Sequence, residues 1–204
     1  MEDKRKEIIE KSAAVFLRHG IRSVTMDDLA RELSMSKKTI YNYFKDKDDL
    51  IQRIVSTLIH QNQQESECSR ERSADAIEAL MSISNFATRL FTEIHSSVFF
   101  DLQKYYPEAW AIVQNYRKEI IHGKISQNIL RGQEEGVYLK ELNPKIMAEI
   151  HLSMVTALTN GAIFNTDINK FGEVLEEIIL FQLRGIVNDK GREILNKHMK
   201  NKVK

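Results

Sequence analysis

Apolar residues recur every three or four positions along most of the chain, a spacing that predicts amphipathic helices. The first repeat consists of Ile9, Ala13, Phe16 and Leu17 and predicts a helix from about residue 4 to residue 19. Gly20 follows it and can take the left-handed conformation in which helices often end. The opening segment is therefore expected to be a single helix.

A short helix is expected from about residue 26 to residue 33. Thr25 stands before it as a capping hydroxyl, and Asp27 and Asp28 place two carboxylates at the positive end of the helix dipole. Residues 34–36 then leave room only for a turn. Two short helices are thus predicted to meet across three residues, which is the arrangement of a helix-turn-helix.

The second short helix is expected over residues 37–44, capped by Ser36, with Ile40 and Phe44 on its buried face. The rest of its surface carries Lys37, Lys38, Thr39, Tyr41, Asn42 and Tyr43. Ammonium and hydroxyl groups donate to phosphate oxygens, asparagine pairs with adenine, and tyrosine rings or threonine methyls touch thymine methyl groups. The pattern therefore predicts a recognition helix that reads duplex DNA in the major groove.

The remaining chain continues the helical pattern. A fourth helix begins near Lys47, carries an apolar stripe to about residue 60 and extends into the polar stretch 61–73. Further helices are expected at about 74–94, 97–105, 107–135, 144–163, 170–187 and 190–199. With two prolines and eight glycines among 204 residues, and 42% apolar residues to form a core, the expected fold class is all-α.

Charge becomes informative only when its distribution is considered. The whole chain has 30 basic and 29 acidic residues, so its net charge gives no argument for nucleic-acid binding. Between residues 34 and 47, however, four lysines face a single aspartate, a local surplus of +3. A DNA-binding surface is therefore expected to be local and to lie on the second short helix and its flanks.

Other chemistry is sparse along the chain. Cys68 is the one cysteine, so it forms no internal disulfide, and we interpret it as an incidental thiol. The amino terminus is charged and leads into an amphipathic helix, and no apolar run approaches the ~18 residues that span a bilayer. We therefore expect a cytoplasmic protein that makes no membrane contact and needs no cofactor or metal.

Residues 25–50 read TMDDLARELSMSKKTIYNYFKDKDDL and resemble the signature of the TetR family of bacterial transcription regulators. The likeness spans about residues 8–58, and it departs from the family where glycine often stands in place of Ser34 and of Lys38. A short polar side chain tolerates the dihedral angles of the turn, so Ser34 changes little. Lys38 places a long cation where the backbone often approaches DNA closely, so it adds a contact or shifts the register.

The resemblance implies phosphate contacts from Thr25, Tyr41 and Lys47. It makes Lys37, Lys38, Asn42 and Tyr43 candidates for base or mixed contacts, and Ser36 and Thr39 complete the expected DNA-binding set. The alternatives are that Thr25 serves only as a helix cap, that Tyr41 or Tyr43 packs on the first helix, and that the two lysines are merely solvated.

The resemblance also implies two domains with different functions. Residues 1–48 would form a helix-turn-helix DNA-binding domain, and residues 49–204 a helical effector-binding and dimerisation domain. The expected function is that of a ligand-responsive repressor that binds a palindromic double-stranded operator as a homodimer.

Two late helices, expected at 144–163 and 170–187, are apolar around most of their circumference, so each must be buried on more than one side. In the family two such helices form a dimeric four-helix bundle, and the alternative is a monomeric core. Aromatic residues gather earlier, between 86 and 116, where the family places its pocket. The candidates for contact with an unknown small apolar or aromatic effector are Phe86, Phe99, Tyr105, Trp110, Tyr116 and Met154. The alternative is that these side chains form ordinary core.

Two other classes of function compete with this interpretation. Glu119 and His122 lie three apart on a predicted helix, as in di-iron enzymes, but such a site needs a second Glu-x-x-His pair, which the sequence lacks. Metalloprotease, hydrolase and phosphate-binding motifs are also missing, so no enzyme is expected. A helical adaptor that binds protein would differ in its salt response, because DNA affinity falls steeply as salt rises.

Overall fold

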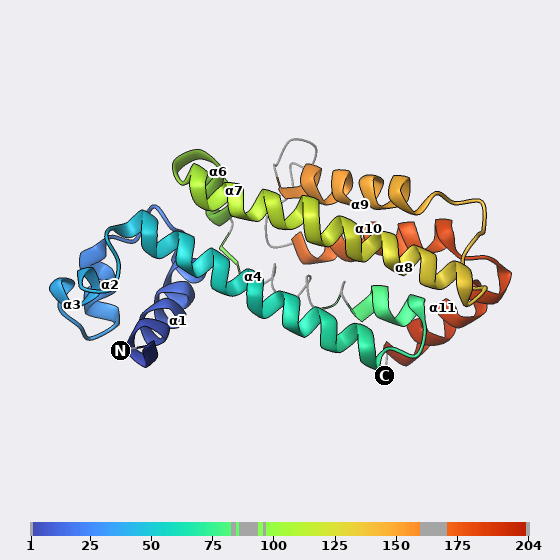
Figure 1. Ribbon diagram of the computed structural model, residues 1–204, viewed down its shortest axis with the longest axis horizontal. Coiled ribbons are helices and arrows are strands. Elements are labelled where there is room, and N and C mark those ends of the chain that lie inside the picture. The colour runs from blue at the N-terminus through green and yellow to red at the C-terminus, as the bar shows by residue number, and fades with distance from the viewer. Residues whose placement is uncertain (1, 83–84, 86–93, 96, 160–170, 203–204) are drawn as a thin grey trace. The chain divides into compact units, whose positions relative to one another are not determined.

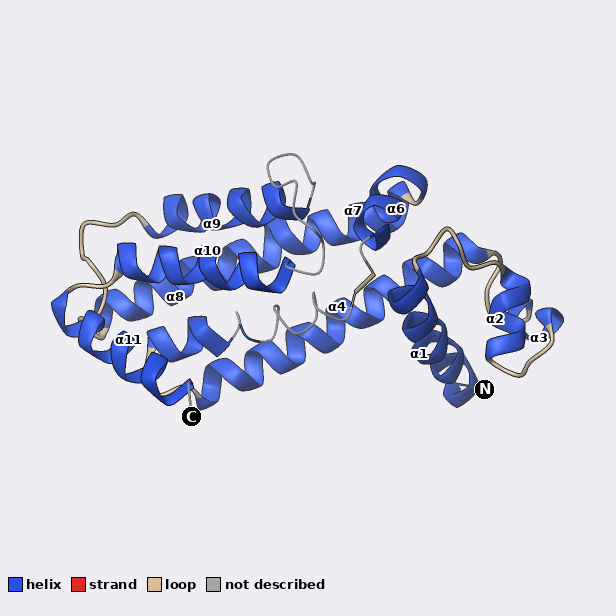
Figure 2. Cartoon of the chain, turned by 180° about the vertical axis from the view of Figure 1, so that it is seen from behind, coloured by secondary structure: helices blue, strands red, loops and turns tan. Residues whose placement is uncertain are grey.

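The computed structural model describes residues 2–82, 85, 94–95, 97–159 and 171–202, which form helices and short connections (Figures 1 and 2). Within these residues no strand occurs, and a single β-bridge pairs Tyr138 with Val187. The predicted all-α class is confirmed. The chain divides into two compact units, Met1–Gln63 with Glu93–Tyr116, and Gln64–Thr92 with Arg117–Lys204.

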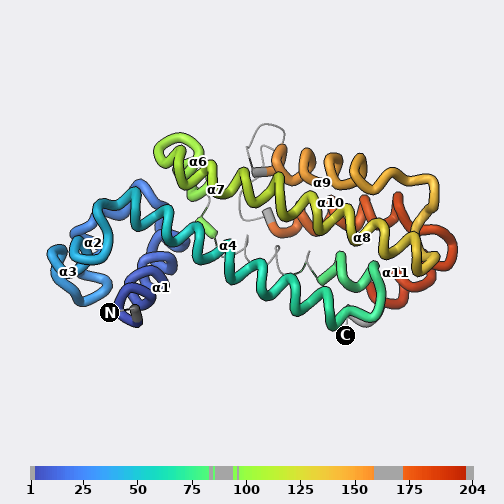
Figure 3. The backbone as a smooth tube through the Cα atoms, in the orientation of Figure 1, coloured from blue at the N-terminus to red at the C-terminus, as the bar shows by residue number. Residues whose placement is uncertain are grey.

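The first unit combines the N-terminal helices with two from the middle of the chain. Its elements are α1 (Glu2–His19), α2 (Met26–Glu32), α3 (Lys37–Tyr41), the first part of α4 (Lys47–Arg72), α6 (Ser97–Tyr105) and α7 (Pro107–Asn115). Figure 3 traces the backbone from α1 through α3 into α4. One core joins them and includes Ile8, Phe16, Leu29, Ile40, Phe44, Leu50, Val98 and Leu102. Because α6 contributes to this core, the unit is larger than a helix-turn-helix.

The second unit is built from later helices. Its elements are the end of α4, a helical segment at 76–82, α8 (His122–Glu134), α9 (Pro144–Thr159), α10 (Phe171–Ile186) and α11 (Asp189–Lys202). α8 and α9 lie side by side, and α10 packs on α9 (Figures 1 and 2). Gly132 in α8 makes room for Tyr138, because a Cβ at this position would lie 2.1 Å from the tyrosine ring.

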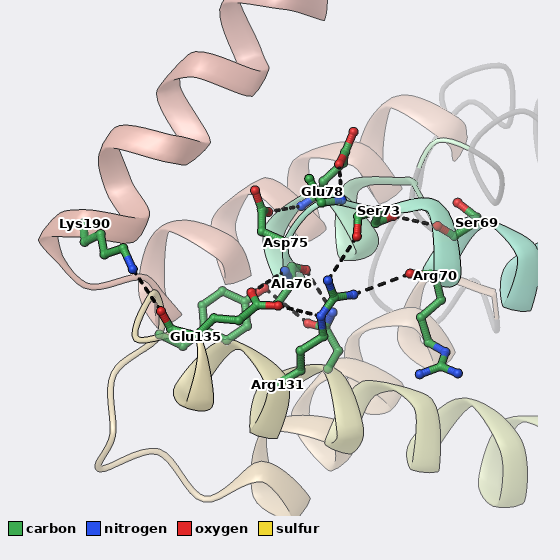
Figure 4. Close-up of polar contacts among 12 residues, drawn as sticks. Ser69, Arg70, Ser73, Asp75, Ala76, Glu78, Arg131, Glu135 and Lys190 are labelled. Atoms are coloured by element: carbon green, nitrogen blue, oxygen red, sulfur yellow. Dashed lines mark hydrogen bonds and ion pairs between the residues drawn. The ribbon is translucent and has the colours of Figure 1, made fainter.

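A polar cluster joins helix ends within the second unit (Figure 4). The Arg131 guanidinium donates from Nε to Glu135 Oε1 at 2.6 Å and from Nη2 to the Ser73 carbonyl at 3.0 Å. Glu135 Oε2 accepts from the Ala76 N–H at 2.8 Å, and Lys190 Nζ donates to the Glu135 carbonyl at 3.0 Å. These bonds tie the end of α8 to the segment after α4 and to the start of α11.

Most helix ends agree with the sequence prediction within a few residues, but two elements differ. The recognition helix α3 ends at Tyr41 rather than at residue 44, and the chain tightens after it, since the Tyr43 N–H donates to the Ile40 carbonyl three residues back. The helix expected as one piece over 107–135 contains a π-helical turn, Tyr116–Ile121, between α7 and α8. The predicted helical residues 83–84, 86–93, 160–163 and 170 lie outside the described residues.

Candidate DNA-binding site

α2 begins at a complete capping box. Thr25 Oγ1 accepts from the Asp28 N–H at 3.2 Å, and the Asp28 carboxylate accepts from the Thr25 N–H at 2.9 Å. The Thr25 hydroxyl also donates to this carboxylate at 2.6 Å, and its hydrogen bonds lower the pKa of Asp28. Thr25 therefore caps α2, and because it is exposed it is also open to contact from a DNA phosphate.

Ser34 shapes the turn between α2 and α3. Its backbone φ is +53°, in the left-handed region that glycine usually occupies. The Ser34 N–H donates to the Arg31 carbonyl at 3.1 Å, and the Met35 N–H donates to the Ala30 carbonyl at 2.9 Å. The turn thus has the conformation expected of a glycine position, although a serine occupies it.

α3 is anchored on one face and exposed on the other. Ile40 and Phe44 are buried in the core, and Ser36 Oγ caps the helix by accepting from the Thr39 N–H at 3.0 Å. The exposed residues are Lys37, Lys38, Tyr41 and Asn42, and Thr39 and Tyr43 are partly exposed. Tyr41 exposes 44% of its surface, so it does not belong to the core that Ile40 and Phe44 join.

Hydrogen bonding divides these exposed residues into two groups. Lys37 Nζ forms an ion pair with Asp27 Oδ2 at 3.1 Å, which links α3 to α2. Within the described residues no side-chain hydrogen bond involves Lys38, Tyr41 or Asn42. The second group is therefore the one whose polar atoms are turned to solvent.

Lys47 lies at the start of α4 and points its ammonium into the unit. Its Nζ donates to the carbonyl oxygens of Ile21 and Val24, at 2.6 Å each, in the connection between α1 and α2. It also lies 5.4 Å from the centre of the Phe16 ring and 5.8 Å from that of Tyr106. Burial lowers the pKa of Lys47, and nearby carboxylates oppose that shift.

Asp101 is a residue of this unit that the sequence analysis missed. It lies in α6 with 4% of its surface exposed, and its Oδ2 accepts from the N–H groups of Ile21 and Arg22 at 3.0 and 2.9 Å. A carboxylate inside the apolar run of residues 98–102 is the signal that could have found it. Such a charge is buried only where donors satisfy it.

The expected effector-contact residues fall in different parts of the chain. Phe99, Tyr105, Trp110 and Tyr116 belong to the first unit, and Trp110 packs against its N-terminal core. The Tyr105 ring lies beneath the Arg22 guanidinium, whose carbon is 4.4 Å from the ring centre. Phe86 lies outside the described residues.

Met154 belongs to the second unit and lines an open pocket of about 490 Å³. The other lining residues are His122, Lys145, Ile146, Glu149, Ile150 and Ser153. The pocket wall thus combines the apolar side chains of Ile146, Ile150 and Met154 with four polar ones, among which His122 Nε2 lies 3.4 Å from Glu149 Oε1.

The structure adds little to the competing interpretations. Across the described ranges, no three histidine, cysteine or acidic side chains are grouped as a metal ion would require. In the same ranges, no helix has both the length and the apolar character needed to cross a membrane.

The arrangement is that of a helix-turn-helix in a DNA-binding regulator. Two short helices meet across a tight turn, and the second of them is capped and carries lysine, tyrosine and asparagine on its outer face. Residues 8–54 match the family model of the bacterial regulatory proteins of the tetR family. The uncharacterised HTH-type transcriptional regulator YvaF of Bacillus subtilis is 24% identical over 185 residues, which cover 90% of this chain and 96% of that protein.

Solved structures agree in fold. A putative transcriptional regulator from Saccharomonospora viridis, crystallised in complex with choline, matches with a TM-score of 0.72 and 18% identity, over 92% of this chain and all of that one. A transcriptional regulator from Cytophaga hutchinsonii matches with a TM-score of 0.74 and 16% identity, over 91% of this chain and 99% of that one. Residues 8–54 therefore carry the DNA-binding part of the bacterial tetR-family regulators, and over most of its length the chain is similar to HTH-type transcriptional regulators.

Proposed function

We propose that this protein is a ligand-responsive repressor of the TetR family that binds a palindromic operator as a homodimer. The observation that carries the proposal is α3, which buries Ile40 and Phe44 while Lys38, Tyr41 and Asn42 face solvent. A helix held in this way presents its outer side chains to the major groove without a change of fold. We assign DNA binding to residues 1–48 and effector binding with dimerisation to residues 49–204.

The proposed contacts follow from the polar atoms available on this surface. Phosphate contacts come from Thr25, Tyr41 and Lys47, and base or mixed contacts from Ser36, Lys37, Lys38, Thr39, Asn42 and Tyr43. An ammonium has three N–H donors, and the two carbonyls of the α1–α2 connection take up two of them in Lys47. The third donor is the one that we assign to a phosphate.

Exposed apolar side chains on α9 and α10 support dimerisation. Ile146 and Ile150 on α9 expose 55% and 42% of their surface, and Phe181 on α10 exposes 68%. The same helices bury Ala148, Leu158, Leu175 and Leu183 inside their own unit. Each helix is therefore apolar on two sides, and a second copy of the chain would remove the outer side from water. Two identical reading heads then require an operator with two-fold symmetry.

The effector remains defined only as a small apolar or aromatic molecule. The pocket beside Met154 supports its place in the second unit, and because Ile146 and Ile150 line this pocket as well, an effector there would lie beside the proposed dimer contact. Phe86, Phe99, Tyr105, Trp110 and Tyr116 stay candidates on the sequence pattern alone. That a regulator of the same fold was crystallised with choline is consistent with a small ligand. Such a ligand releases DNA only if it binds the DNA-incompetent state more tightly, and DNA must then weaken the ligand by the same factor.

The test is selection of duplexes from a random pool by the full-length protein at low salt. We expect enrichment of one inverted repeat, with half-sites about one helical turn, ~34–36 Å, or a compatible larger distance apart. Folded protein that enriches no sequence contradicts the proposed function. Enrichment of a single unrepeated half-site would contradict the dimeric part of it.

A further inference from the structure

The connection between α1 and α2, residues 20–25, is held by α6 as well as by its neighbours in sequence. The Leu17 carbonyl, at the end of α1, accepts from the His95 N–H at 2.6 Å. The N–H groups of Ile21 and Arg22 donate to Asp101 Oδ2, which also accepts from the Ser97 hydroxyl at 3.3 Å. Three successive points of the end of α1 and its connection are thus tied to residues 95–101.

Lys47 holds the same connection as a hydrogen-bond donor, whereas Asp101 holds it as an acceptor. While Asp101 accepts from the Ile21 N–H, the Lys47 ammonium donates to the Ile21 carbonyl and to that of Val24. Ile21 is therefore fixed at both its backbone donor and its backbone acceptor by charged side chains. Hydrogen bonds with an ionised partner are shorter and stronger than those between neutral groups.

The consequence appears one residue later in the chain. Thr25 follows directly on Val24 and starts α2 by its capping box, so the place where the connection ends is the place where the helix-turn-helix begins. α2 in turn carries the turn at Ser34 that leads into α3. A shift of the connection would therefore be passed to Tyr41 and Asn42.

We propose that Asp101, although it lies outside the helix-turn-helix, is a positioning residue for DNA recognition that fixes the α1–α2 connection and thereby the orientation of α2 and α3. The inference rests on the DNA contacts assigned above to α3. It assigns a part in operator binding to α6, a helix that the sequence pattern placed in the effector-binding region.

The experiment compares Asp101→Asn and Asp101→Ala with Gln103→Ala, an exposed position on the same helix. Affinity for the duplex selected by the wild-type protein is measured at a temperature where circular dichroism shows each variant to be folded. Amide hydrogen exchange is measured by NMR on the same samples without DNA. We expect Asp101→Ala to weaken operator binding by about tenfold or more, since it removes an ionised acceptor from two N–H groups.

Exchange at the amides of Ile21 and Arg22 should accelerate by about tenfold or more in the same variant, while the amides of Leu29 and Ile51 in the core stay protected. Asp101→Asn keeps the shape and one acceptor oxygen, so both effects should be smaller in it. Gln103→Ala should match the wild-type protein in both measurements.

Faster exchange with unchanged affinity would overturn the proposal, because Asp101 would then only stabilise the connection. Unchanged exchange would overturn it as well. If both Asp101 variants are unfolded at every usable temperature, the residue is required for folding and the assigned role is wrong. Failure of the wild-type protein to select any duplex speaks against the proposed function instead, and the exchange data without DNA separate the two cases.

Discussion

At the scale of single residues, two positions with a left-handed backbone stand before and after α2, and one is a glycine whereas the other is a serine. Gly20 has a φ of +83°, a conformation that favours glycine, and a Cβ there would lie 2.5 Å from Ser97 Oγ, so any other residue would also displace the Ser97 hydroxyl. Ser34 has a φ of +53°, a region in which a side chain raises the conformational free energy relative to glycine. The departure of Ser34 from the family pattern therefore leaves the geometry of the turn intact.

Lys47 is predicted to serve both the fold and the DNA. Lys47→Met removes two hydrogen bonds from a charged donor and should lower the free energy of unfolding by about 1–3 kcal/mol. It should also weaken matched and scrambled duplexes alike and reduce the salt slope of binding by about 1, as loss of one phosphate contact requires. The control is Lys45→Met, which removes an exposed charge nearby and should leave stability unchanged. A loss of stability with an unaltered salt slope would show that Lys47 contacts no phosphate.

His151 is predicted to make stability depend on pH. It is buried between α9 and α10, where its Nδ1 lies 2.8 Å from Gln182 Oε1, and burial lowers its pKa below the ordinary value of 6.5. The unfolded chain then binds more protons than the folded one, so stability is highest above pH 6.5 and falls as pH drops toward the folded-state pKa. Urea unfolding at several pH values should show a weaker dependence in His151→Gln. The exposed His19→Gln is the control, and an equal effect of both substitutions would exclude His151 as the cause.

At the scale of elements, the helices were predictable because the residues that cap them lie next to the helix starts in the sequence. Thr25 with Asp28, and Ser36 before Lys37, place the starts of α2 and α3 where the structure has them. The π-helical turn at Tyr116–Ile121 was not predictable, since an apolar repeat is compatible with either helix type over so short a stretch. Asp101 escaped notice because its partners, the amides of Ile21 and Arg22, lie about eighty positions away. Contacts of this range depend on how the helices pack, which local patterns do not specify.

Asn42 in the recognition helix is predicted to contribute to sequence specificity more than to the overall affinity for DNA. Asn42 is exposed on α3, and a side-chain amide that pairs with adenine discriminates against a wrong base by about 1–3 kcal/mol. Asn42→Ala should therefore narrow the difference in affinity between the selected duplex and a scrambled one. Gln127→Ala, an exposed amide in α8, serves as the control and should leave that difference unchanged. Equal weakening on both duplexes by Asn42→Ala would instead assign this side chain to the phosphate backbone.

At the scale of the whole molecule, the two compact units cut across the boundary expected from the sequence motif. The motif suggests a DNA-binding part that ends at residue 48, whereas the first compact unit extends along α4 to Gln63 and takes in Glu93–Tyr116. A division defined by contacts can differ from one defined by function, so the assignment of residues 1–48 to DNA binding stays a prediction.

Dimerisation is predicted to depend on the exposed apolar face of α9 and α10. Phe181→Glu replaces a ring that is exposed in the single chain, so the fold should persist while the proposed contact gains an unpaired charge. Sedimentation at micromolar concentration should then report monomers, and operator affinity should fall because two half-sites are no longer bound together. Leu130→Glu changes an exposed leucine of α8, outside this face, and should remain dimeric. A wild-type protein that sediments as a monomer under these conditions would contradict the prediction.

The interleaved order of the units constrains how reading heads can be exchanged between regulators. A chimera that transfers only residues 1–63 of this chain would set its α1–α2 connection against the α6 of another regulator, without the Asp101 carboxylate that accepts from Ile21 and Arg22. It would also lack Val98 and Leu102, which belong to the same core. Such a graft would fold with a mismatched core even if its recognition helix were intact. A graft that retains operator specificity should carry both segments, Met1–Gln63 and Glu93–Tyr116, as one transferable piece.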